Sequence, residues 1–195
     1  MKNVKLAALA MSALLALAAE VRADAGDLYG HLRVININPN VSSNIPGLDV
    51  DTRTSAEVGL TYFFTREIAG EFGITRAKHD VTLSGANIGT VKITPVNLAI
   101  QYHWNMGSPF IPYAGAGLNY TNISGVDLGG LGLDSSSTGG LLQLGANYDL
   151  NKSFRLNGDI RKIWLNSDVF APGGAKAGDI DIDPWALSIG IAMKF

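Results

Sequence analysis

The chain contains no cysteine, and only 16% of its residues are charged. Without cysteine no disulfide can stabilise the fold, so a large buried or lipid-facing surface must do so. Residues 93–126 carry no Lys, Arg, Asp or Glu, but Pro95, Pro109 and Pro112 interrupt this stretch. These prolines exclude a membrane-spanning helix there.

Recognisable catalytic and metal-binding motifs are also missing. The three histidines are dispersed and give no metal-ligand spacing, and no Gly-x-Ser-x-Gly motif is present. We therefore expect no enzymatic activity, no metal and no cofactor. The formal net charge of −2 gives no indication of nucleic-acid binding.

The first residues are typical of an export signal. Two lysines precede the apolar run Leu6–Ala19, and small residues follow at Ala23 and Ala25. A positive start, a short apolar core and a small-residue cleavage site together define a signal peptide. The run is shorter than the roughly 20 residues that a membrane-spanning helix needs. We predict that residues 1–23 are a cleaved signal peptide and that 24–195 form the exported domain.

Period-two alternation of apolar and polar residues, bounded by turn residues, predicts eight strands. The connections between them are alternately long and short. In small outer-membrane barrels the short turns are periplasmic, the long loops are extracellular, and both termini lie on one side. We therefore predict an all-β, eight-stranded antiparallel transmembrane barrel in the bacterial outer membrane, with four long extracellular loops and both termini periplasmic. The predicted strands cover residues 27–36, 53–64, 67–77, 91–104, 110–122, 139–150, 153–166 and 181–195.

The long loops are rich in Gly, Ser, Asn and Asp, so we expect them to be mobile rather than packed. Apolar residues within them are candidates for an entrance at the outer rim. The alternative is that these side chains pack on one another over the barrel mouth. The candidate entrance residues are Ile45, Leu48, Leu131, Leu133, Val169 and Phe170.

The final strand has large apolar side chains at every second position, and these lie on one face. An alternating strand that ends in an aromatic residue is also how bacterial outer-membrane barrels finish. We expect this strand to be the assembly signal that the barrel-assembly machinery binds. Its apolar face consists of Trp185, Leu187, Ile189, Ile191, Met193 and Phe195.

The cost of placing charge in lipid indicates which face of each strand points inward. A Lys or Arg on the lipid face near the bilayer midplane costs about 2 to 4 kcal/mol, so charged positions mark the interior. Two interpretations of these charges remain: an ion-pair network that plugs part of the lumen, or a polar floor below an apolar entrance. The predicted polar lumen-lining residues are His31, Arg33, Glu57, Glu71, Asn97, Gln101, Asn119, Gln143, Asn147, Asp159 and Arg161.

Glycines share the same inward positions. An eight-stranded barrel is just wide enough for its own side chains to fill, so missing side-chain volume favours a ligand-sized cavity. The alternative is that glycine relieves crowding and lets the strands bend. The predicted small lumen residues are Gly59, Gly73, Gly115, Gly117, Gly145 and Gly190.

Several segments, in this order, resemble the outer membrane protein W (OmpW) family: Pro95 with Leu98–Trp104, the stretch Pro112–Thr121, and Ile182–Trp185 ahead of Phe195. The resemblance implies an eight-stranded barrel with a narrow, largely hydrophobic interior that moves small apolar molecules inward. It also implies that the outer loops can serve as docking sites for bacteriocins or phage.

Two functions follow as hypotheses. The first is a narrow channel for passive uptake of small hydrophobic molecules. The alternative is a non-conducting structural or adhesion barrel whose outer loops dock a bacteriocin or a phage. In either case we expect a monomer whose partners are outer-membrane lipid and lipopolysaccharide, together with small hydrophobic solutes in the first case.

Overall fold

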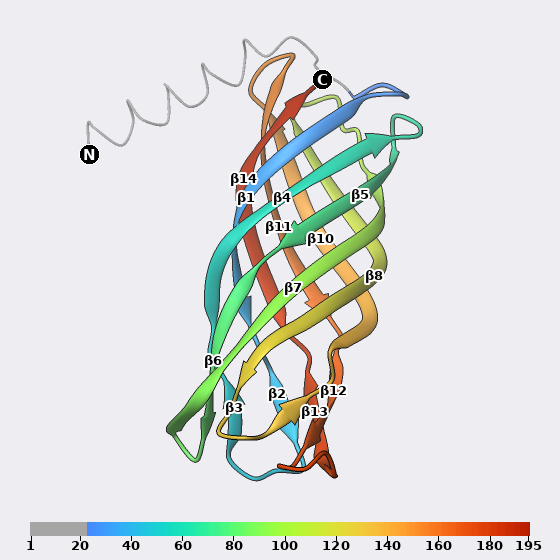
Figure 1. Ribbon diagram of the computed structural model, residues 1–195. Helices are drawn as coiled ribbons and strands as arrows, with labels where there is room; N and C mark the ends of the chain where they lie inside the picture. Colours follow the sequence, from blue (N-terminus) through green and yellow to red (C-terminus); the bar gives the residue numbers. More distant parts are fainter. Residues whose placement is uncertain (1–22) are drawn as a thin grey trace, which may run out of the picture.

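The computed structural model describes residues 23–195, so the predicted signal peptide lies outside the described residues except for Ala23. The described part consists of strands and their connections, and the ribbon encloses an elongated barrel (Figure 1). Within residues 23–195 there is no helix long and apolar enough to cross a membrane. The C-terminus lies at the same end as the short turns, which we name the turn end; the opposite end is the loop end.

The predicted eight-stranded antiparallel barrel is confirmed. Each wall strand pairs with its neighbours, and the circle closes where the first wall strand, β1, meets the last, β14. His31 illustrates this seam, because it lies opposite Ala192 on one side and Gly59 on the other. The wall strands are β1 (Leu28–Asn38), β4 (Arg53–Phe63), β5 (Ile68–Thr75), β7 (Ala86–His103), β8 (Phe110–Asp127), β10 (Ser136–Asp149), β11 (Phe154–Ile163) and β14 (Trp185–Lys194).

The outer face of the barrel is apolar. Large aliphatic side chains that a water-soluble protein would bury are exposed here, including Leu118 at 64% and Ile189 at 67%. Exposed aromatic side chains gather at the turn end, where Tyr62 packs edge-on against Phe64. An apolar band bordered by aromatic residues is the outer surface of a membrane barrel.

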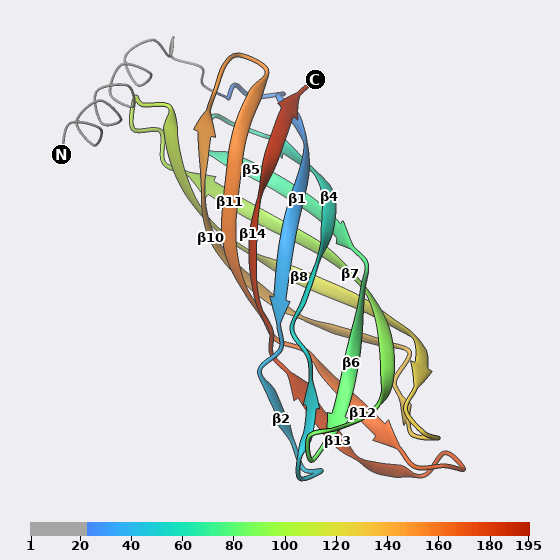
Figure 2. The ribbon, with the colours of Figure 1, turned by 90° about the vertical axis from the view of Figure 1, so that its left-hand side faces the viewer.

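The loop segments are paired rather than free, which corrects the expectation of mobile loops. The strand β6 (Ala77–Leu83) pairs with the long first half of β7, and β3 (Leu48–Val50) pairs with β6. A separate four-stranded sheet lies at the loop end, where Figure 2 shows β12 and β13 below the wall. It contains β2 (Val41–Ser43), β9 (Gly132–Leu133), β12 (Asn166–Phe170) and β13 (Lys176–Ile182).

The strands in the loops were not predicted because their runs of alternating apolar and polar residues are short. Val169 is buried while its neighbours in β12 are less so, which is the period of a half-buried strand. The actual turns are tighter than the predicted loops, as at Gly173 and Gly174, which have φ values of 100° and 87°. Pairing satisfies backbone groups that would otherwise need water.

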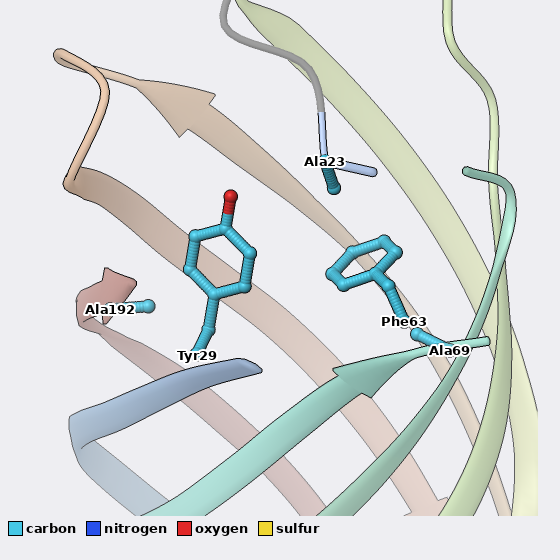
Figure 3. Close-up of a cluster of buried hydrophobic side chains, with 5 residues drawn as sticks. All are labelled: Ala23, Tyr29, Phe63, Ala69 and Ala192. Atoms are coloured by element: carbon cyan, nitrogen blue, oxygen red, sulfur yellow. The ribbon is translucent and has the colours of Figure 1, made fainter. Parts of the chain in front are cut away.

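Inside the wall, side chains form three layers. The layer at the turn end is apolar and aromatic, and Figure 3 shows Tyr29 and Phe63 facing each other across it beside Ala23. Their rings meet edge to face at 5.8 Å. A charged layer follows in the middle, and an apolar layer lies at the loop end. The middle and loop-end layers form the candidate functional site.

Candidate functional site

The structure places all eleven predicted polar lumen residues inside the barrel, where none is more than 5% exposed. Their strands alternate strictly, so each of these side chains points inward while its neighbours point to lipid. Arg33, Glu57 and Arg161 are among the most deeply buried, at 2%, 0% and 0%.

Two arginines on β1 and β11, which are separated in the wall only by β14, hold the middle layer together. Arg33 on β1 donates to Glu57 at 2.9 Å and to Glu71 at 2.6 Å. Arg161 on β11 donates to both oxygens of Glu57, at 2.5 and 3.0 Å, and to Glu71 at 3.2 Å. Arg161 also binds Asp159 at 2.9 Å. The two guanidinium groups therefore share the carboxylates of Glu57 on β4 and Glu71 on β5.

Neutral groups complete the coordination of this network. Asp159 accepts hydrogen bonds from Tyr113 at 3.1 Å and from Ser188 at 2.9 Å. Asn157 accepts a hydrogen bond from Arg33 and donates to Asn147 at 2.8 Å. Buried charges need such partners because burial removes them from solvent. The middle layer is thus a dense plug, which agrees with the interpretation that the charges fill part of the lumen.

The turn end is sealed by further residues that the sequence analysis did not select. Arg155 binds Asp149 at 2.9 Å, donates to the Tyr29 hydroxyl at 2.8 Å and stacks over that ring at 3.8 Å. His103 lies between Phe63 and Tyr113, 4.9 Å from each ring centre. Arg155 occupies the same face of β11 as Asp159 and Arg161, so the alternation already contained the signal that places it inside.

The inward glycines do not create a cavity, which corrects the prediction from missing volume. A Cβ atom added at Gly117 would overlap the Leu98 carbonyl oxygen, and one at Gly190 would overlap that of Leu32. At Gly59 it would meet the His31 ring, and at Gly145 the Tyr113 ring. These positions lack side chains because neighbouring strands and rings occupy the space. A Cβ added at Gly73 would lie 3.3 Å from the Glu57 side chain, and one added at Gly115 would lie 3.0 Å from the Gln143 side chain. Both positions are therefore tightly packed as well.

A cavity of about 70 Å³ lies instead at the loop end, above the plug. It is larger than the 10–15 Å³ or so that one water needs, yet smaller than pockets of roughly 300 Å³ that hold drug-sized ligands. A larger solute therefore enters only if side chains move. Its lining is mostly aliphatic and includes Ile37, Val81, Val91, Ile93, Ile123, Leu128 and Ile180.

Four of the six predicted entrance residues line this cavity: Leu48, Leu131, Leu133 and Val169. The other two do not, and they correct the prediction. Phe170 follows Val169 on β12, so its side chain points to the other face and lies beside Gly132. Ile45 lies beside Gly178 of β13. Composition alone selected both residues, because strand pairing in the loops was not foreseen.

His79 is the most deeply buried of the few polar residues in the lining, at 1% exposure. Its Nδ1 lies 2.7 Å from the Asp51 carbonyl oxygen, so Nδ1 carries the proton in that contact. Its Nε2 is buried without a hydrogen-bond partner within residues 23–195. Burial, the largest influence, lowers the pKa of His79. The neutral ring therefore keeps the cavity free of charge.

The predicted assembly strand is β14. All six of its selected side chains face outward, with exposures from 39% at Met193 to 71% at Phe195. Recognition of this strand by the assembly machinery remains a prediction.

Comparison with known proteins identifies the family. The OmpW family model matches residues 24–195. The chain belongs to the OmpW family. It is 30% identical to outer membrane protein W of Vibrio cholerae over 193 residues, covering 87% of this chain and 89% of the relative. It is 32% identical to the dibenzothiophene metabolism operon protein PahQ of Pseudomonas aeruginosa over 136 residues, covering 67% and 64%.

A solved barrel agrees with this assignment. The crystal structure of the outer membrane protein OprG from Pseudomonas aeruginosa matches this OmpW-family chain with a TM-score of 0.77 and 26% identity. The match covers 88% of this chain and 97% of OprG. The protein is therefore an outer-membrane barrel of the OmpW type.

Proposed function

We propose that this barrel is a passive, non-enzymatic route for small hydrophobic molecules across the outer membrane. The observation that carries this function is the aliphatic cavity at the loop end, closed below by the buried ion-pair plug. An apolar solute gains free energy by leaving water for such a lining, at about 25 cal/mol per Å² of apolar surface removed from water. Ions gain nothing there, so the cavity selects for apolar solutes.

The orientation of the chain is part of this proposal. The loop end faces the medium and both termini face the periplasm, as in other small barrels with long loops at one end and short turns at the other. The cavity then faces the side from which external solutes arrive. The name of the relative PahQ supports an apolar cargo, since dibenzothiophene is an aromatic compound without charge.

The route beyond the cavity avoids the plug. A solute that moved straight down the barrel would have to separate Arg33 and Arg161 from their shared carboxylates, which leaves buried charges unpaired. Release sideways through the wall into the bilayer leaves the plug intact. We therefore propose lateral release into the bilayer.

Uptake by reconstituted liposomes tests this function. Liposomes that contain the wild-type protein should accumulate an uncharged aromatic probe several times faster than empty liposomes. Val169→Phe fills part of the cavity and should slow accumulation, because Val169 lies in the lining. Phe170→Leu is the matched control, since the adjacent Phe170 lies outside the lining and its replacement should change little. Equal rates in wild-type and empty liposomes would overturn the proposal.

One observation favours the alternative of a docking barrel. The loop end carries a paired four-stranded sheet, which presents a fixed surface to the outside. A barrel with the same plug but no solute flux would serve as such a surface. Phage or bacteriocin sensitivity that disappears with the protein, together with the absence of probe uptake, would establish this second function.

A further inference from the structure

Three basic side chains lie close together on the outside of the wall, just above its apolar band. Arg76, Lys78 and Lys92 are exposed, and the alternation of β6 and β7 turns them away from the interior. Toward the turn end on the same face, Ile74 follows Arg76, and Thr94 and then Val96 follow Lys92. The basic side chains therefore lie where the hydrocarbon layer ends and the lipid headgroups begin.

Two of these side chains form a directly opposed pair. Lys78 on β6 and Lys92 on β7 are partners in the antiparallel register. Like charges in such a pair destabilise a sheet. The stem of Lys92 is held on the outer face, because it lies across Gly125 of β8, where an added Cβ would be 3.1 Å from Lys92 Cδ. Gly125 has a φ of 53°, which favours glycine at this contact.

The part of the chain that the structure describes supplies no counter-charge for this pair. Within residues 23–195, no carboxylate lies within 4.0 Å of Arg76, Lys78 or Lys92. The nearest acidic residue along β6, Asp80, already binds Arg53. Asp127 lies opposite Thr90, farther toward the loop tips. From the membrane outward, the surface is apolar, then positive, then mixed, so the unmatched positive charge is confined to the headgroup level.

We propose that Arg76, Lys78 and Lys92 bind the phosphate groups of the glycolipid in the outer leaflet. A phosphate between the two lysines replaces their repulsion by two charge-assisted hydrogen bonds, and the arginine adds a bidentate contact. The diphosphorylated lipid A of lipopolysaccharide has this chemistry at this depth. The choice of leaflet depends on the proposed orientation of the loop end, whereas the phosphate site itself does not.

The test uses purified protein in a neutral detergent, titrated with diphosphorylated lipid A and followed by the shift in melting temperature. The apparent dissociation constant of the double variant Lys78→Gln/Lys92→Gln should rise about thirtyfold, because each basic residue near a lipid surface contributes about 1 kcal/mol and about 1.4 kcal/mol corresponds to a factor of ten. Without lipid A the same variant should melt no lower than the wild type, because the like-charge pair is gone. Lys78→Arg/Lys92→Arg should retain binding.

The control variant is Arg66→Gln/Lys152→Gln, which makes the same change in net charge at the turn end and should leave lipid A binding unchanged. Inorganic phosphate and phosphatidylcholine replace lipid A in parallel titrations, and both should give much smaller shifts. Equal lipid A affinity in the wild type and the Lys78→Gln/Lys92→Gln variant would overturn the site. An equal loss in the Arg66→Gln/Lys152→Gln control would overturn it too.

Failure of this site is distinguishable from failure of the transport function. Liposomes without lipid A should show the same probe uptake with the wild type and with Lys78→Gln/Lys92→Gln. A wild-type protein that binds lipid A through these lysines but takes up no probe would refute transport alone.

Discussion

Arg161 connects three buried carboxylates of the interior. Its guanidinium group is fully buried and contacts Glu57, Glu71 and Asp159 within 3.2 Å. Of the network's five charged groups, only Arg33 is also positive, so the loss of Arg161 would leave three carboxylates with one cation. The burial of charge without a partner is much more costly than the pair is stabilising.

We predict that Arg161→Met destabilises the folded barrel by about 3–5 kcal/mol. The free energy of unfolding, measured by urea titration in lipid vesicles, checks this value. The double variant Arg161→Met/Glu57→Gln should recover part of the loss, because one unpaired carboxylate is removed. Arg66→Met, which breaks only the exposed pair with Asp24, should cost less than about 1 kcal/mol. A single variant as stable as the wild type would show that the plug is wetted rather than sealed.

At the level of strands, the predictability of this protein depends on how long each alternating run is. The alternating run 53–64 predicted β4 (Arg53–Phe63) to within one residue. The alternation on β4 and on β11 also predicted correctly that Glu57 and Arg161 point inward. Long wall strands repeat the pattern often enough to fix which face is buried. The shorter strands β2, β3, β9 and β12 repeat the alternation only once or twice. Their Gly, Ser, Asn and Asp content therefore led us to expect loops at these positions.

The contact partners of the interior were less predictable than its faces. Parity placed the glycines inward but did not show whether open space or a neighbouring strand faces them, since that depends on how closely the strands approach. The cavity likewise combines residues from the wall and four loop segments, and its position depends on pairings between distant parts of the chain.

The close approach of β1 and β14 gives a prediction for strand packing. We predict that Gly190→Ala lowers the melting temperature of the barrel by several degrees, because the new methyl group would collide with the Leu32 carbonyl oxygen. Gly158→Ala on the neighbouring strand β11 is the matched control, as its Cβ would lie 3.4 Å from the nearest atom, the Ser188 oxygen. Equal melting temperatures for the two variants would mean that the seam can widen without cost.

For the molecule as a whole, function depends on which end faces outward. The loop end holds the aliphatic cavity and the basic cluster, while the turn end is closed by aromatic side chains and Arg155. The two ends therefore differ in both shape and chemistry, and the proposed uptake begins at the loop end.

The orientation is measurable because the chain has no cysteine of its own. We predict that a membrane-impermeant maleimide labels Ala175→Cys on intact cells, since Ala175 is exposed between β12 and β13 at the loop end. Lys152→Cys, in the short turn between β10 and β11, should react only after the outer membrane is permeabilised. The reverse labelling pattern would place the loops in the periplasm and remove the proposed route for uptake.

The seam between β1 and β14 also has a consequence for biogenesis. The plug combines Arg33 from β1, Glu57 from β4 and Glu71 from β5 with Arg161 from β11, which is made much later in synthesis. A half-assembled wall would expose Arg33, Glu57 and Glu71 to acyl chains before Arg161 is in place. Such intermediates are thereby penalised, and the completed ring is the first state in which both arginines contact all of their carboxylate partners.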